Sequence, residues 1–219
     1  GLMGAGRTEL VESIYGLRPS QGKVWVAGKL VEHPNPTLMR NLGVAFVPED
    51  RRLHGLFDIR SLRENLTVAA ISRLVQSIIP GIGFRGESNS ASRIAEHLRI
   101  VHSGIEGAIR FLSGGNQQKA LLGRWLAIEP QVCILDEPTR GVDIGAKEEI
   151  HALIGKLARS GTAVLLVSSE LPELMMLAHR IMVLRKGKAV IEFTRDAFDP
   201  RMIIKYAASA TEEINENAI

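Results

Sequence analysis

Leu112-Ser113-Gly114-Gly115-Asn116-Gln117-Gln118-Lys119 decides the fold of this chain, together with the run Cys133-Ile134-Leu135-Asp136-Glu137-Pro138-Thr139-Arg140-Gly141-Val142-Asp143 that follows it. The Ser-Gly-Gly turn opens a predicted helix, where free N–H groups and the helix dipole favour a bound anion. The second run is an apolar strand that ends in two carboxylates, one suited to a metal and one to a water. The alternative is a glycine-rich turn before an ordinary core strand.

Together the two runs closely resemble the signature and Walker B segments of an ABC-transporter ATPase. The Asn-Gln-Gln-Lys ending further resembles the branch that imports ribose, xylose, arabinose and galactosides. The resemblance extends from Gly1 to about Phe193, and it implies a P-loop α/β fold with a mainly parallel sheet, a small antiparallel β part and a helical subdomain at about 58–128. We expect residues 1–219 to form a single nucleotide-binding domain that is incomplete at its N-terminus.

A P-loop-like segment opens the chain, with Arg7 in place of the usual lysine. The resemblance implies that nucleotide is bound by Gly1, Gly4, Ala5, Gly6, Arg7 and Thr8. A P-loop normally follows a buried strand, and none precedes this one. We therefore expect a fragment, or part of a longer chain. Without the missing central strand, its P-loop should be disordered or displaced, or should borrow a strand from another chain.

The same resemblance implies ATP and Mg²⁺ as cofactors and assigns roles to the acidic residues. Thr8 and Asp136 are the expected metal ligands, and Glu137 is expected to orient or deprotonate the attacking water. A surface salt bridge is the alternative for Glu137. Asp143 matches the loop that links the two sites of an ABC dimer, and capping of the next helix is a second role that can hold beside the first. The expected signature residues are Leu112, Ser113, Gly114, Gly115, Asn116 and Gln117.

Three positions depart from the family pattern. Arg7 is wider than lysine and is not equivalent to it in a tight loop. Glu49 stands where a glutamine is expected, and its carboxylate repels a triphosphate unless a metal lies between them; a strand-end turn residue is the alternative. Ser169 stands where a histidine is expected, and its neutral hydroxyl makes a weaker hydrogen bond than a charged group does. We expect Glu137, Ser169 and Glu49 at the catalytic positions, in a site of reduced competence.

Because the signature is intact, we infer the second half of a fused importer ATPase, whose signature completes the site of the first half. The expected activity is ATP hydrolysis coupled to uptake of a monosaccharide or similar small polar solute, with the isolated chain weak or inactive. The implied partners are the other ATPase half or subunit, transmembrane permease subunits and, indirectly, a periplasmic sugar-binding protein, at the cytoplasmic face of the cell membrane. The alternatives are a non-catalytic nucleotide-binding regulator and a soluble ABC protein that acts on ribosomes or DNA.

Composition favours a globular protein that does not bind nucleic acid. The chain is 45% hydrophobic and 23% charged, with a formal charge of +3 and scattered basic residues. Nucleic-acid binding favours a clustered basic stripe with aromatics, and aromatics are only 5%. No apolar run approaches the roughly 18 residues that span a bilayer. The single cysteine, Cys133, lies in an apolar run and is expected in the core.

Hydrophobic periodicity and turn residues predict the elements. Ser61 and Glu64 form a predicted capping box, and residues 162–167 a strand buried on both faces. A flexible break is expected at 80–90 and a frayed tail at 211–217. The predicted helices are 9–15, 61–74, 90–98, 113–127, 144–159 and 172–178, and the predicted strands are 23–27, 44–47, 132–135, 162–167, 180–184 and 188–193.

Overall fold

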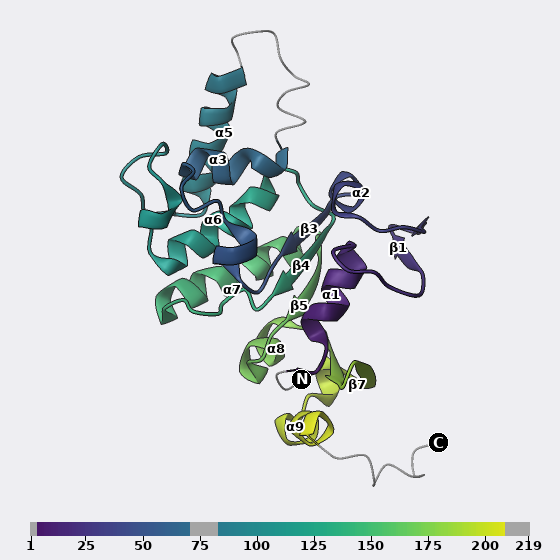
Figure 1. Ribbon diagram of the computed structural model, residues 1–219. Coiled ribbons are helices and arrows are strands. Elements are labelled where there is room, and N and C mark those ends of the chain that lie inside the picture. The colour runs from purple at the N-terminus through teal and green to yellow at the C-terminus, as the bar shows by residue number, and fades with distance from the viewer. Residues whose placement is uncertain (1–3, 71–82, 209–219) are drawn as a thin grey trace, which may run out of the picture. The chain divides into compact units, whose positions relative to one another are not determined.

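The computed structural model describes residues 4–70 and 83–208. The chain divides into two compact units (Figure 1). The central unit is Val11–Val167, and the terminal unit combines the N-terminal segment up to Leu10 with the chain from Ser168 onward. Helix α1 (Arg7–Tyr15) begins in the terminal unit and ends in the central unit. Within the described residues, no helix is both long and apolar enough to cross a bilayer.

A parallel sheet of three strands organises the central unit. Its order is β3 (Val44–Val47), β4 (Val132–Asp136) and β5 (Ala163–Val167), with Val44 opposite Val132 and Asp136 opposite Val167. The β3 residues are buried on both faces, whereas Ala163 and Leu165 of β5 are exposed, Leu165 by 41%. The prediction of a fully covered strand at 162–167 is therefore wrong. Both β3 and β5 are edge strands of this sheet among the described residues, but Val44 and Phe46 of β3 belong to a buried apolar core, to which β5 contributes only the partly buried Val167.

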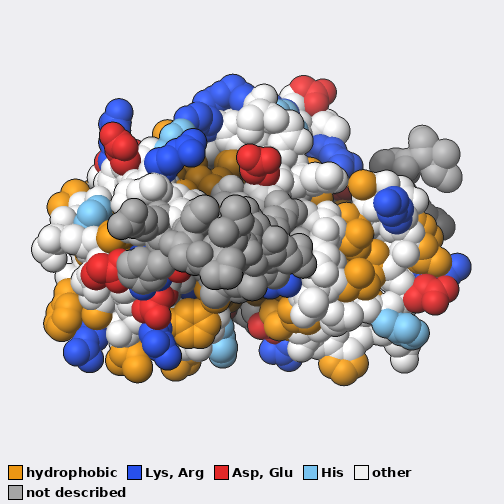
Figure 2. All heavy atoms as spheres, turned by 90° about the horizontal axis from the view of Figure 1, so that it is seen from above, with side chains coloured by type: hydrophobic (Ala, Val, Ile, Leu, Met, Phe, Trp, Pro, Cys, Tyr) orange, Lys and Arg blue, Asp and Glu red, His pale blue; other side chains and the backbone are white. Residues whose placement is uncertain are grey.

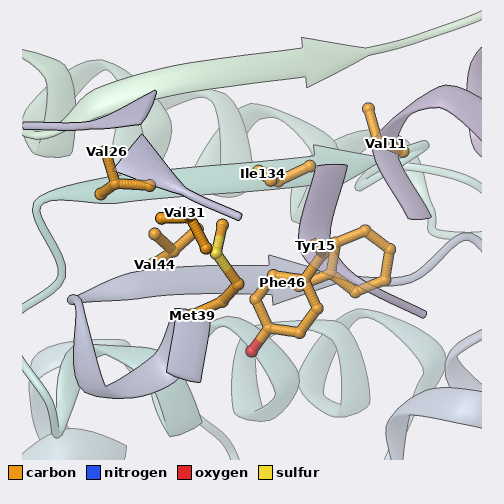
Figure 3. Packing of buried hydrophobic residues seen from close by; sticks show 8 residues of the cluster. All are labelled: Val11, Tyr15, Val26, Val31, Met39, Val44, Phe46 and Ile134. Atoms are coloured by element: carbon orange, nitrogen blue, oxygen red, sulfur yellow. The ribbon is translucent and has the colours of Figure 1, made fainter. Parts of the chain in front are cut away.

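One face of this sheet carries an apolar core. Figure 3 shows Tyr15, Met39, Phe46 and Ile134 converging there, together with residues of the hairpin β1 (Val24–Val26) and β2 (Lys29–Val31). The rings of Tyr15 and Phe46 stack with centroids 5.0 Å apart, and burial raises the pKa of the Tyr15 phenol to about 12. Cys133 is also buried, which raises its thiol pKa to about 12. The prediction of a core cysteine is confirmed.

Helices flank the sheet in the central unit. These are α2 (Pro36–Asn41), the π-helical turn η1 (Arg51–Gly55), α3 (Leu62–Thr67), η2 (Val68–Ala70), α5 (Gly83–His97), η3 (Ile109–Phe111), α6 (Gly114–Leu126) and α7 (Ile144–Arg159). Helix α6 packs against β3 and α7 against β5, and α3 lies against α5 and α6. The capping box of α3 is confirmed, because Ser61 Oγ accepts from Glu64 N at 3.1 Å and Glu64 Oε2 accepts from Ser61 N at 2.9 Å.

Other boundaries differ from the sequence prediction. Helix α3 gives way to η2 after Thr67, and residues 71–74 of the predicted helix lie outside the described residues. The predicted break at 80–90 is wrong from Gly83 onward, because α5 begins there. Its first half is anchored by tertiary contacts, since Glu87 accepts a hydrogen bond from Thr67 at 2.6 Å and pairs with Arg63 at 2.8 Å. Such contacts override the low helix propensity of glycine.

The terminal unit is built on an antiparallel hairpin, β6 (Arg180–Arg185) and β7 (Lys188–Thr194). Helices α8 (Leu171–Leu177) and α9 (Pro200–Ala208) and the short η4 (Arg195–Ala197) complete it. Its core contains Ile181, Val183, Phe193 and Ile203. Helix α9 was not predicted from the sequence, nor were α2, β2 and η1. The predicted tail at 211–217 lies outside the described residues.

The buried Arg124 side chain of α6 forms hydrogen bonds to α3 and η1. Its Nε donates to Asn65 O at 2.9 Å, its Nη2 to Asn65 Oδ1 at 3.0 Å and its Nη1 to Gly55 O. The guanidinium is buried, and desolvation lowers its pKa to about 10. A buried charge is tolerated when it is fully hydrogen-bonded, and here the bonds connect η1, α3 and α6.

We expect Arg124→Ala to lower the free energy of unfolding by on the order of 2–3 kcal/mol, because each buried polar group left without a partner costs about 1–3 kcal/mol. The exposed Arg93 on α5 gives a matched control, and Arg93→Ala should stay within about 0.5 kcal/mol of the parent. Urea denaturation followed by circular dichroism measures both. Equal midpoints for the two variants would show that the Arg124 bonds do not stabilise the fold.

Candidate functional site

The signature turn forms the start of α6. Ser113 is the N-cap residue, with its Oγ accepting from the Asn116 N–H at 3.4 Å and from Asn116 Nδ2 at 3.0 Å. Its side chain is exposed at the helix start. Backbone N–H groups at a helix N-terminus that small residues leave accessible can bind an anion. The sequence prediction of a helix opening on this turn is confirmed.

The two glycines of the turn lie against the segment that follows the acidic strand. A Cβ built on Gly115 would lie 2.4 Å from the Cβ of Ala146, in the first turn of α7. A Cβ built on Gly114 would lie 3.2 Å from the carbonyl oxygen of Gly141. A Cβ atom closer than 3.0 Å to another heavy atom would force the neighbouring residue to shift. Glycine at 115 is therefore required by packing.

The polar residues after the turn hold neighbouring loops. Gln117 is buried, and its Nε2 donates to Leu112 O at 3.1 Å and Ile109 O at 3.4 Å. Asn116 Oδ1 accepts from the Val101 N–H at 3.0 Å. Lys119 Nζ donates to Arg99 O at 2.7 Å and pairs with Glu149 at 2.8 Å. The Asn-Gln-Gln-Lys ending therefore fixes the loops beside the signature, a structural role that the sequence reading missed.

Strand β4 places the predicted Walker B pair at the carboxyl end of the sheet, where ligands bind in open α/β folds. Asp136 is fully buried, and Glu137 is 8% exposed. Glu137 has a φ of +48°, in the left-handed region, which costs a non-glycine residue on the order of 1–3 kcal/mol. Its N–H donates to Val167 O at 2.9 Å, and its carbonyl accepts from Arg140 N at 3.0 Å. These bonds hold Glu137 in a strained conformation of the kind that concentrates at functional sites.

Asp143 caps α7, since its Oδ1 accepts from the Ala146 N–H at 2.9 Å. The capping role expected as its second possibility is confirmed. We call residues 140–143 the D-loop. Gly115 packs against Ala146 in the first turn of α7. Because Asp143 caps that turn, the cap also helps to fix the position of the signature turn.

Glu49 lies just beyond β3, and its carboxylate forms an ion pair with the Arg140 guanidinium. The pair is partly exposed, with 36% of the Glu49 side chain and 61% of the Arg140 side chain accessible. From the sequence, the Glu49 carboxylate is expected to repel a triphosphate unless a metal lies between them. Arg140 supplies a compensating positive charge that the sequence reading did not connect with Glu49.

The P-loop residues belong to the terminal unit. Gly4 and Gly6 have φ values of +75° and +88°, and α1 begins at Arg7 and Thr8. Ala5 is buried, and its carbonyl accepts from Gly187 N at 2.9 Å. The expectation that the P-loop is disordered or displaced, or borrows a strand from another chain, stays a prediction; in the structure the Gly187 turn between β6 and β7 is hydrogen-bonded to Ala5. Gly1, the remaining predicted ligand, lies outside the described residues.

The structure brings some predicted site residues together and leaves others in separate units. The signature Leu112–Gln117, Glu49, Asp136, Glu137 and Asp143 belong to the central unit, whereas Gly4–Thr8 and the exposed Ser169 belong to the terminal unit. The two expected metal ligands, Thr8 and Asp136, are thus divided between the units. As a hydroxyl and a carboxylate, they are the oxygen ligands that Mg²⁺ prefers, and Mg²⁺ at phosphate sites takes only one or two carboxylates from the protein.

On the face shown in Figure 2, lysine and arginine side chains are interspersed with acidic and apolar ones. They do not form one continuous basic stripe on that face. This pattern is typical of an ordinary solvated surface.

Curated relatives match nearly all of this chain. It is 44% identical over 208 residues to a putative ribose/galactose/methyl galactoside import ATP-binding protein 3 from Agrobacterium fabrum, covering 94% of this chain and 41% of that protein. It is 41% identical over 217 residues to the ribose import ATP-binding protein RbsA of Halalkalibacterium halodurans, covering 99% and 43%. With the xylose import ATP-binding protein XylG of Moorella thermoacetica it shares 42% over 198 residues, covering 90% and 39%. The chain therefore spans about two fifths of the length of these relatives.

Solved structures confirm the fold class. The dimeric ATP-binding cassette MJ0796 in a post-hydrolysis state bound to ADP and Pi superposes with a TM-score of 0.73 at 20% identity, covering 90% of this chain and 84% of that one. The ADP conformation of the ATP-binding cassette MJ1267 gives a TM-score of 0.72 at 20% identity, covering 94% and 85%. The family model described as "ABC transporter" matches residues 1–140. With its signature turn, its Asp136-Glu137 strand end and this match, the chain belongs to the ABC transporter family of ATP-binding cassettes.

Proposed function

We propose that this chain is an ATP-binding part of an ABC importer, coupling ATP binding and hydrolysis to uptake of a monosaccharide or similar small polar solute. The names of the relatives support the solute class, since they import ribose, galactosides or xylose. The partners in this proposal are another ATPase half or subunit, transmembrane permease subunits and, through them, a periplasmic sugar-binding protein; the chain itself is proposed to lie at the cytoplasmic face of the cell membrane.

One observation carries the proposal. The signature turn packs on the D-loop through Gly114 and Gly141 and on the start of α7 through Gly115 and Ala146, with the Asp143 cap beside them. A site that binds phosphate between two domains needs its anion-binding turn held in a fixed place, because a misplacement of about 1 Å can cost on the order of 100-fold in rate. This packing keeps the exposed Ser113 and the first amides of α6 in position relative to Glu137.

Each predicted residue then has a role in the proposed reaction. Bound MgATP supplies the transferable phosphoryl group and neutralises part of its charge. In this proposal Thr8 and Asp136 would hold the metal, and Glu137 would orient or deprotonate the attacking water. Ser113 and the N-terminus of α6 hold the γ-phosphate that the P-loop of another domain presents.

The chain's own nucleotide site is proposed to be the weaker one. Arg7 replaces the compact ammonium of the P-loop and Ser169 offers a neutral hydroxyl, whereas the charge of the Glu49 carboxylate is compensated by its ion pair with Arg140. The relatives have room for a second domain of this size, since the chain covers 41–43% of the first two. We therefore propose that this chain acts as the second half of a fused ATPase and contributes its signature to the competent site.

A non-catalytic nucleotide-binding regulator is the second candidate, and the Arg7 and Ser169 substitutions favour it. The strained and buried Glu137 favours hydrolysis instead, because a regulator has no need to hold a water-orienting carboxylate at that energetic cost. Measuring ATP affinity separately from turnover in the intact protein separates the two. Tight binding without turnover supports the regulator, and turnover supports the importer ATPase.

We predict that Ser113→Arg in the intact protein lowers ATP turnover by at least about 100-fold, the effect expected when a positioned anion-site donor is lost. The bulky side chain would fill the anion site, although Ser113 lies in the half proposed to be degenerate. Ser160→Arg, an exposed serine at the far end of α7, is the control and should keep parental turnover. Full turnover in Ser113→Arg would refute the contribution of this signature to the active site.

We predict that Gly115→Ala lowers the free energy of unfolding by about 1–3 kcal/mol through overpacking against Ala146. Adding Ala146→Gly removes the clashing carbon and should restore most of this loss and the ATP turnover. Gly86→Ala is the control, because its Cβ would meet nothing within 4 Å, and it should not destabilise. Urea midpoints and turnover measure all four proteins. A double variant no better than Gly115→Ala would contradict the proposed contact.

A further inference from the structure

Arg51 stands at the start of η1, directly after the exit of β3. The neighbouring Asp50 caps this turn, and its carboxylate accepts from Arg52 N at 2.9 Å and Leu53 N at 3.0 Å. The Leu53 N–H bond lowers the pKa of the Asp50 carboxyl below its ordinary value, with a smaller contribution from the Arg52 N–H. Asp50 therefore stays ionised at neutral pH and caps the turn from which Arg51 projects.

The Arg51 guanidinium bridges two functional segments. Its Nη1 donates to Arg140 O at 2.8 Å and its Nη2 to Gly141 O at 3.1 Å, so both bonds end on the D-loop. A Cβ built on Gly114 would lie 2.9 Å from the same Nη2. The planar fork of arginine suits two adjacent carbonyls, and a lysine ammonium does not reproduce it.

The ion pair of Glu49 and Arg140 completes a reciprocal arrangement. Arg140 is bound at two places: its side chain forms an ion pair with Glu49, and its carbonyl accepts a hydrogen bond from Arg51. A partly exposed ion pair contributes little to stability by itself, but here it joins the same two segments as the Arg51 hydrogen bonds. We call Glu49, Arg51 and Arg140 the β3–D-loop latch.

We propose that Arg51 is a positioning residue, which sets the D-loop and the first glycine of the signature from the end of β3, and that Glu49 and Arg140 complete this latch. The inference rests on the proposed function for its turnover readout, while the latch itself is a property of the central unit. Glu49 thus has a structural reason to replace glutamine, since a neutral amide cannot form the ion pair with Arg140.

The first test compares Arg51→Ala, Arg51→Lys and the exposed neighbour Arg52→Ala in the intact protein. We expect Arg51→Ala to lower kcat for ATP at least tenfold while KM changes less than threefold, because Arg51 contacts the loops rather than the nucleotide. The kcat of Arg51→Lys should lie between those of the parent and Arg51→Ala, and the kcat of Arg52→Ala should equal that of the parent. Parental kcat in Arg51→Ala, or a rise in KM at unchanged kcat, overturns the positioning role.

The second test reverses the ion pair. Glu49→Arg and Arg140→Glu should each lower kcat, and the double variant should recover at least half of the loss because the pair re-forms with exchanged charges. A double variant as slow as the worse single variant overturns the participation of Glu49 and Arg140.

A third readout separates failure of the latch from failure of the proposed function. Hydrogen–deuterium exchange of the peptide spanning 138–147 should accelerate several-fold in Arg51→Ala and stay unchanged in Arg52→Ala. Unchanged exchange in Arg51→Ala overturns the latch whatever the turnover. If the parental protein, supplied with its membrane partners, does not hydrolyse ATP while exchange accelerates as expected, the latch stands and the proposed function fails.

Discussion

The contact between Gly115 and Ala146 is the constraint on which the candidate site depends. Their backbones approach so closely that a single added methyl carbon would lie 2.4 Å from its neighbour. Because protein interiors are close-packed and respond as stiff bodies, this contact ties the start of α6 to the start of α7. Since α7 follows the D-loop and the D-loop follows β4, the anion-binding turn and the acidic strand end are held as one body.

Polar contacts extend this body to the rest of the central unit. Arg124 joins η1, α3 and α6 through buried hydrogen bonds, and Arg51 reaches the D-loop from the other end of η1. Both arginines donate hydrogen bonds to backbone carbonyl oxygens. Each therefore links elements that are distant in sequence without needing a matching acidic partner. The short η1 turn is in this way connected to both helices and strands around the site.

Local chemistry made much of this fold predictable from sequence. The capping box at Ser61 and Glu64, the Asp143 cap and the apolar strands were visible because neighbouring residues determine them. The start of α5 was not, because Glu87 is held by Arg63 and Thr67 from another helix. The exposure of β5 depends on which elements pack against it, which its apolar sequence does not reveal. The bonds of Arg51 were hidden for the same reason, since they span 89 and 90 residues.

The central claim is that the signature of this chain acts on nucleotide held by another domain's P-loop. Ultraviolet irradiation of an ATPase trapped with Mg²⁺, ATP and vanadate cleaves the backbone beside the bound vanadate, and mass spectrometry maps the cut. The account predicts that the intact protein, trapped in this way with its membrane partners, is cleaved at Ser113 and at the P-loop of the other half, with Arg7–Thr8 left intact. Cleavage at Arg7–Thr8 with an uncut Ser113 would contradict it.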